Sequence, residues 1–284
     1  MLRNTLFITL FSALFILNGC GGGSASTASS KTSTQPSQAS TQIQPITQEV
    51  EKTNTIPTIK TTNKILKTID LLVLVDKNDK NNFNGLNETK IDHFISVTNK
   101  VYENSGLDVK LNIKKIQAYT FNSNKTSDET LYDVYTDKKI TQIKNDVKAD
   151  LVITYRKYAN DGYCGVAYVN HRLDADVGYA HVSLECPSTT TAHEIGHSMG
   201  LTHSQLNTHN TGVFNYARGY GTEGEFVTIM GYESTFHTKN QMFNYSSPSL
   251  DCRGYECGVD SELDNGADAV KALKYAIDYV ADFR

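Results

Sequence analysis

Hydrophobic positions in the first half of the folded region follow two periods, that of strands and that of helices. Residues 69–75 (IDLLVLV) form an almost continuous apolar run, which predicts a strand buried on both faces. Residues 86–104 place apolar side chains at helical spacing, and Gly106 follows as a stop signal. The pattern continues with a strand at 107–116, a helix at 128–147 and a strand at 150–155. This βαβαβ order predicts a mostly parallel sheet with right-handed crossovers.

The second half of the chain has weaker periodicity. Residues 164–169 and 179–184 read as two further short strands. The chain after position 203 is rich in Gly, Asn and Tyr, which predicts a small irregular subdomain. Residues 266–283 close the chain with an amphipathic helix. The predicted fold class is therefore α/β (α+β), with five strands in the main sheet.

The segment HEIGHSMGLTH, which starts at His193, carries the candidate chemistry. His193 and His197 are one helical turn apart, so both imidazoles point from the same face. Gly200 lets the chain leave the helix sharply, and His203 returns to the same place. Three neutral imidazoles and one open position make a catalytic zinc site, and Glu194 is placed to act on a water as general base.

The alternative is a surface helix with three unrelated histidines. The extended HExxHxxGxxH spacing disfavours it, because a chance match to five fixed positions is rare. The other histidines of this region are interpreted as ordinary strand or loop residues: His171, His181, His209 and His237.

The extended motif resembles that of the metzincin clan of zinc metallopeptidases, which also have a methionine-containing turn downstream. Residues 228–232 (TIMGY) supply such a turn after His203. The resemblance implies that Met230 forms an apolar floor beneath the zinc and its imidazoles. It further implies that Tyr232 binds the metal or stabilises the oxyanion of the reaction.

This resemblance covers residues 66–284 and implies a fold. The expected fold is a twisted, mostly parallel five-stranded sheet with an antiparallel edge strand, a zinc helix and an irregular C-terminal subdomain ending in a helix. A peptide substrate could pair with the edge strand, expected near residues 165–169. The chain is most similar to bacterial reprolysin-like metzincins. Ser204 departs from them, because they usually have Asp after the third histidine, and this leaves the subfamily open.

The N-terminal region predicts export. Residues 1–19 have a positive Arg3 and an apolar stretch of signal-peptide length, and LNGC ending at Cys20 resembles a bacterial lipobox. We expect Cys20 to be lipidated; an ordinary secretory signal is the alternative. Residues 20–64 are rich in Ser, Thr and Gln and predict a disordered tether. Residues 65–284 then form the catalytic domain.

Four cysteines remain after Cys20, and an even number in an exported protein suggests two disulfides. Three pairings are possible. We favour Cys164 with Cys186 and Cys252 with Cys257; buried free thiols are the alternative.

The net charge of −4 comes without a sustained basic patch, which argues against a nucleic-acid partner. The sequence therefore predicts a zinc-dependent endopeptidase with one catalytic Zn²⁺, a monomer that cleaves proteins or peptides outside the cytoplasm. Its lipid anchor would hold it at the outer membrane or cell surface of a bacterium.

One alternative is a zinc-containing binding or adhesion lipoprotein with little turnover, but such a protein has no use for the general base Glu194. Another is an enzyme that processes peptidoglycan-linked peptides or a single partner protein.

Overall fold

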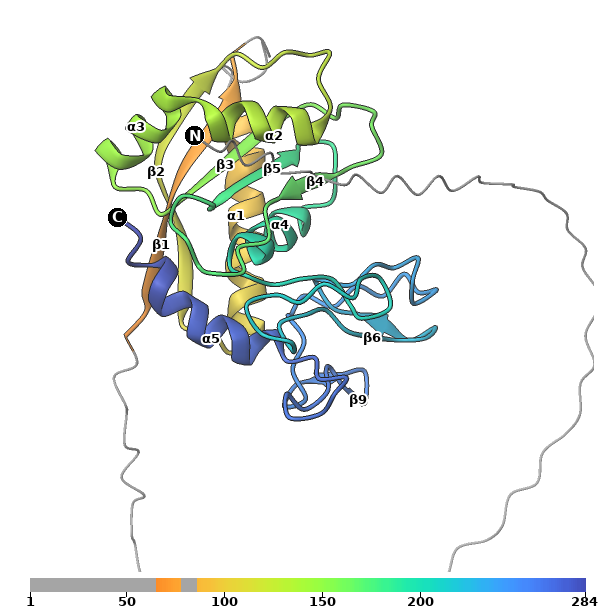
Figure 1. Ribbon diagram of the computed structural model, residues 1–284. Helices are drawn as coiled ribbons and strands as arrows, with labels where there is room; N and C mark the ends of the chain where they lie inside the picture. The colour runs from red at the N-terminus through yellow and green to blue at the C-terminus, as the bar shows by residue number, and fades with distance from the viewer. Residues whose placement is uncertain (1–64, 78–85) are drawn as a thin grey trace, which may run out of the picture. The chain divides into compact units, whose positions relative to one another are not determined.

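The computed structural model describes residues 65–77 and 86–284 (Figure 1). The predicted signal peptide, the lipidation site Cys20 and the tether lie outside these residues. Among the helices that are described, none is both long enough and apolar enough to cross a membrane.

A five-stranded sheet forms the centre of the fold (Figure 1). Four neighbouring strands are parallel, and the fifth runs antiparallel at one edge. In spatial order the strands are β2 (Val109–Tyr119), β1 (Lys67–Asp76), β3 (Leu151–Arg156), β5 (Tyr179–Ser183) and β4 (Gly165–Ala167). The predicted parallel sheet with an antiparallel edge strand is thus confirmed.

Helices cover both faces of this sheet, which explains the continuous apolar run of β1. Alternate residues such as Leu71 and Val73 belong to a core shared with α1 (Leu86–Asn104), α4 (Thr190–Ser198) and α5 (Ala269–Val280). The residues between them, Leu72 and Leu74, pack on the opposite face against α2 (Ser127–Thr136) and α3 (Lys138–Val147). All four side chains are fully buried, as expected for a strand between two helical layers.

The single helix predicted over 128–147 is wrong, because the chain forms two helices there. Asp137 lies between them in an extended conformation, and its side chain accepts a hydrogen bond from the backbone N–H of Lys139. A short polar side chain that caps the backbone competes with helix continuation. The apolar periodicity runs through the break, which is why the pattern did not reveal it.

Other helix ends agree with the sequence signals. Gly106 has a positive φ of 66° just after α1 ends at Asn104, a conformation that favours glycine. Helix α5 begins after Asp268, whose carboxylate accepts a hydrogen bond from the backbone of Lys271.

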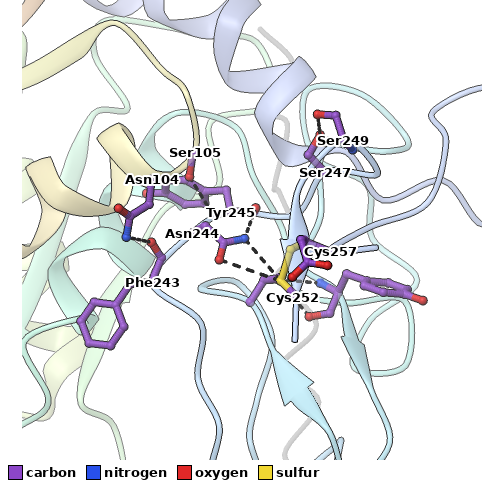
Figure 2. The surroundings of a disulfide bond; sticks show 12 residues. Asn104, Ser105, Phe243, Asn244, Tyr245, Ser247, Ser249, Cys252 and Cys257 are labelled. Carbon is purple, nitrogen blue, oxygen red and sulfur yellow. Dashed lines mark hydrogen bonds between the residues drawn. A yellow bond between two sulfur atoms is a disulfide. The ribbon is translucent and has the colours of Figure 1, made fainter. Parts of the chain in front are cut away.

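The chain after the third histidine is irregular, as predicted. It holds two short hairpins, formed by β6 (Gly221–Thr222) with β7 (Phe226–Val227) and by β8 (Asp251–Cys252) with β9 (Tyr255–Glu256). Both favoured disulfides are present. Cys252 pairs with Cys257 across the second hairpin, with Cα atoms 5.1 Å apart (Figure 2). Cys164 pairs with Cys186 over 5.5 Å and ties the start of β4 to the segment before α4.

Tyr245 fastens this subdomain to the rest of the fold. Its backbone N–H donates to the hydroxyl of Ser105 at the end of α1, as Figure 2 shows. Its ring stacks on Tyr102, with centroids 6.0 Å apart. Its buried hydroxyl donates to the carbonyl oxygen of Ala192 in α4 over 2.7 Å. One side chain therefore links α1, α4 and the C-terminal subdomain.

Replacing Tyr245 with Phe removes the hydroxyl and keeps the ring. A buried hydrogen bond contributes about 1 kcal/mol to stability, so we expect the free energy of unfolding in urea to fall by about that amount. Tyr275→Phe is the control, because the Tyr275 hydroxyl bonds Tyr279 on an exposed surface. Equal losses in the two variants would contradict the anchoring role of Tyr245.

Candidate active site

Helix α4 carries the candidate catalytic residues through the protein core. It is nine residues long, and eight of them are buried. The helix ends where Gly200 adopts a φ of +86°. A side chain there would also lie 2.8 Å from Cβ of Val213 and 3.1 Å from the carbonyl oxygen of Asn170. Gly200 therefore allows the chain to turn sharply and return at His203, as the motif predicts.

The three predicted ligands converge on one point. The Nε2 atom of His203 lies 3.1 Å from Nε2 of His193 and 3.0 Å from Nε2 of His197. In the described part of the chain, these three residues are the one group of His, Cys, Asp or Glu side chains close enough to share a metal ion.

Backbone carbonyls fix the orientation of two of the rings. Nδ1 of His193 lies 2.7 Å from the carbonyl oxygen of Ile229, and Nδ1 of His197 lies 2.9 Å from that of Leu201. Each Nδ1 must carry the proton for this contact to be a hydrogen bond, so each Nε2 presents a lone pair. Such outer partners hold the tautomer and orientation that a metal requires.

The donor set fits zinc. Three nitrogens bound to one zinc at tetrahedral angles lie about 3.3 Å apart, close to the separations observed here. Burial also keeps the imidazoles neutral: it lowers the pKa of His197 well below its usual value, and that of His203 to about 3. Neutral imidazole is the form that binds metal.

Glu194 lies beside this cluster and is almost completely buried. Burial raises the pKa of its carboxyl to about 8, because low-dielectric surroundings disfavour the charged form. Gly165 of the edge strand β4 provides the space for this side chain: a carbon added at position 165 would lie 2.6 Å from Cγ and 2.7 Å from Oε1 of Glu194.

Tyr232 and Met230 both contact elements of the histidine cluster or its helix. The Tyr232 hydroxyl is 2.7 Å from Nε2 of His203, so it reaches the point where the imidazoles meet. Burial raises the pKa of Tyr232 to about 12, helped by the electrostatic influence of Glu194 and Tyr163. Met230 is fully buried, and a side chain at Gly196 in α4 would lie 2.6 Å from its sulfur. The glycine inside the motif therefore lets Met230 pack directly against the helix.

A cleft of about 520 Å³ opens beside His193 and Glu194. One wall is the segment 162–165, which includes Cys164 of the first disulfide, and another is the segment 231–233. Thr189, at the start of α4, also lines it and donates a hydrogen bond to Gln241 on the same cleft. The candidate catalytic groups are thus accessible from an open groove.

The remaining histidines play other parts. His181 is fully buried and contacts Thr154 through Nδ1 over 2.7 Å, whereas exposed His237 pairs with Glu223. Sequence reasoning missed Gly165 and Tyr245, which support the site from distant positions. Their only signals were a glycine inside a short strand and a tyrosine in a polar loop.

Comparisons with known proteins agree with this geometry. The profile of the family described as "Metallo-peptidase family M12B Reprolysin-like" matches residues 88–204, which end one residue after His203. The fold is metzincin-like. The chain is 29% identical over 224 residues to the "Peptidyl-Asp metalloendopeptidase" of Pseudomonas aeruginosa, an alignment that covers 69% of this chain and 37% of the relative.

A solved structure shares the fold. It is titled "Structure of a chaperone-substrate complex" and superimposes with a TM-score of 0.63 at 22% identity, covering 77% of this chain and 39% of that one. The chain thus spans less than two fifths of the length of either protein.

Gly165→Ala tests the packing of Glu194. The added methyl must displace the carboxylate, so we expect peptide cleavage to fall at least tenfold, in line with the sensitivity of catalysis to small misplacements. Bound zinc should stay near its original level, whereas overpacking beside the buried carboxyl group should lower the free energy of unfolding in urea by about 1–3 kcal/mol. Val166→Ala, on the same strand, adds no atom beside Glu194 and serves as the control. Normal cleavage by Gly165→Ala would show that this close approach has no catalytic role.

Proposed function

We propose that this protein is a zinc-dependent endopeptidase that hydrolyses peptide bonds in proteins or peptides. The observation that carries the proposal is the convergence of the Nε2 atoms of His193, His197 and His203 beside buried Glu194, on an open cleft. A metal site with a general base next to it and a groove for an extended chain is the arrangement that metal-assisted peptide hydrolysis needs.

The three imidazoles would hold the zinc, which supplies a Lewis acid that polarises the scissile carbonyl and acidifies water. Glu194 accepts the proton of the attacking water and later delivers it to the leaving amine. A buried carboxyl group beside the metal site can take a proton and release it again during the reaction. The Tyr232 hydroxyl donates a hydrogen bond to the oxygen that becomes negative as the carbonyl is attacked.

The edge strand β4 would bind the substrate backbone. It pairs with β5 on one side only, so its other edge can hydrogen-bond an extended peptide in the manner of an added strand. The match to the reprolysin-like profile and the similarity to a metalloendopeptidase support an endopeptidase. The name of that relative specifies Asp, which makes Asp-containing peptides the first substrates to compare.

We further propose that the chain is exported and held at a membrane by lipid on Cys20, with residues 20–64 as a tether. The lipobox-like LNGC after an apolar stretch supports this. Two disulfides also suit an oxidising compartment outside the cytoplasm. The folded region, residues 65–284, would act there as a monomer.

The second candidate function is a zinc-containing binding lipoprotein, or a processing enzyme with a single partner. Glu194 favours an enzyme, because burying a carboxyl group beside a metal site is costly and a binding protein gains nothing from it. Cleavage of unrelated peptides would decide for the broad endopeptidase.

Glu194→Gln removes the base and keeps the shape of the side chain. We expect the variant to bind zinc with the wild-type stoichiometry while peptide cleavage drops by roughly 10²–10⁴-fold, the usual contribution of proton-transfer catalysis. Cleavage by the wild type should also stop in a zinc chelator and return when zinc is added. Chelator-resistant cleavage, or an active Glu194→Gln variant, would rule out the proposed chemistry.

Tyr232→Phe should reduce peptide cleavage less than Glu194→Gln does. Loss of one hydrogen bond that strengthens during reaction reduces kcat by about tenfold, with bound zinc unchanged. If kcat stays at the wild-type value, Tyr232 takes no part in the reaction.

A further inference from the structure

The cleft beside Glu194 has an acidic and aromatic lining. Two glutamates, Glu194 and Glu233, are among the described residues that line the cleft, and none of these residues is Lys or Arg. Glu194 is committed to catalysis at the inner end. Glu233 follows Tyr232 in the chain and stands at the rim, where it is the second carboxylate available to a bound peptide.

The charge of Glu233 is only weakly paired within the protein. Its carboxylate lies 3.9 Å from Nζ of Lys239, and the Lys239 side chain is 94% exposed. An ion pair this long and this exposed contributes little. The Glu233 side chain is itself 41% exposed, so a cation from the substrate can approach it.

Two tyrosine rings make the rest of the lining suitable for a long cationic side chain. Tyr163 and Tyr232 line the cleft, and both are partly exposed. Aromatic faces attract ammonium and guanidinium groups and also pack against methylene chains. An aspartate side chain entering the same cleft would lose water and meet Glu233, with no Lys or Arg among the described residues that line the cleft, which is costly for a carboxylate.

We propose that this cleft is a subsite for a lysine or arginine side chain next to the scissile bond, with Glu233 as the specificity-determining residue. The inference rests on the proposed peptidase function and names its substrate class. Glu233 acts on binding alone, so it affects the choice of substrate and leaves the chemistry to Glu194.

The experiment compares peptides that differ at one position. A library first identifies the positions that flank the cleaved bond for the full-length, zinc-loaded chain. Peptides with Lys, Arg, Leu or Asp at each of the two flanking positions are then measured. At one position, kcat/KM should be at least tenfold higher for Lys and Arg than for Asp. This preference should shrink as salt is raised, because the rim charge is exposed to solvent.

Glu233→Gln should reduce the preference for Lys over Asp by about three- to fivefold, as expected for a partly exposed charge pair. The change should appear mainly in KM, because the contact is equally strong in the ground and transition states. Glu233→Lys should favour Asp peptides. Glu103→Gln removes an exposed carboxylate from α1 that lines no part of the cleft, and should leave the preference unaltered.

The outcomes separate the two proposals. If the wild type cleaves no peptide in the library, the proposed function is wrong. If it cleaves peptides but shows no preference for Lys or Arg at either flanking position, the function stands and the subsite is overturned. A clear preference that Glu233→Gln leaves unchanged would overturn the assignment to Glu233.

Discussion

The burial of a polar helix is the constraint on which the rest of this structure depends. Helix α4 brings two imidazoles and a carboxyl into the interior, where an unsatisfied polar group costs several kcal/mol. The backbone carbonyls of Ile229 and Leu201 offset this cost for the imidazoles by accepting hydrogen bonds from them. Both carbonyls come from segments that follow the helix in sequence. The Ile229 carbonyl belongs to the irregular C-terminal subdomain, which therefore helps to stabilise this polar helix as well as to complete the site.

Close packing around α4 then determines which residues its neighbours can be. Gly165 and Gly196 lie where any side chain would overlap Glu194 or Met230. Tyr245 donates a hydrogen bond to the backbone of α4 at Ala192, and Figure 2 shows the same segment joined to the end of α1 and to the second disulfide. The precision of the site thus arises from contacts on several sides of one short helix.

Much of this could be predicted from sequence because the signals are local. The spacing of the histidines fixes their common face, and the apolar run of β1 follows from its place between two helical layers. The break at Asp137 escaped prediction because one capping side chain outweighed a continuing apolar period. Gly165 and Tyr245 escaped for another reason. Their partners lie 29 and 53 positions away in the chain (194 − 165 and 245 − 192), and spacing says nothing of such contacts.

The residues at the margin of the cleft are less buried than the catalytic residues at its inner end. Glu194 is part of the buried core, whereas Tyr163 and Glu233 extend from loops at the margin of the cleft. The Cys164–Cys186 disulfide holds the loop that carries Tyr163 covalently, so the position of this loop depends less on its exposed side chains. Exposed positions generally accept substitution at little cost in stability. Substitutions at this margin can therefore change which peptides bind while the buried reacting groups keep their positions.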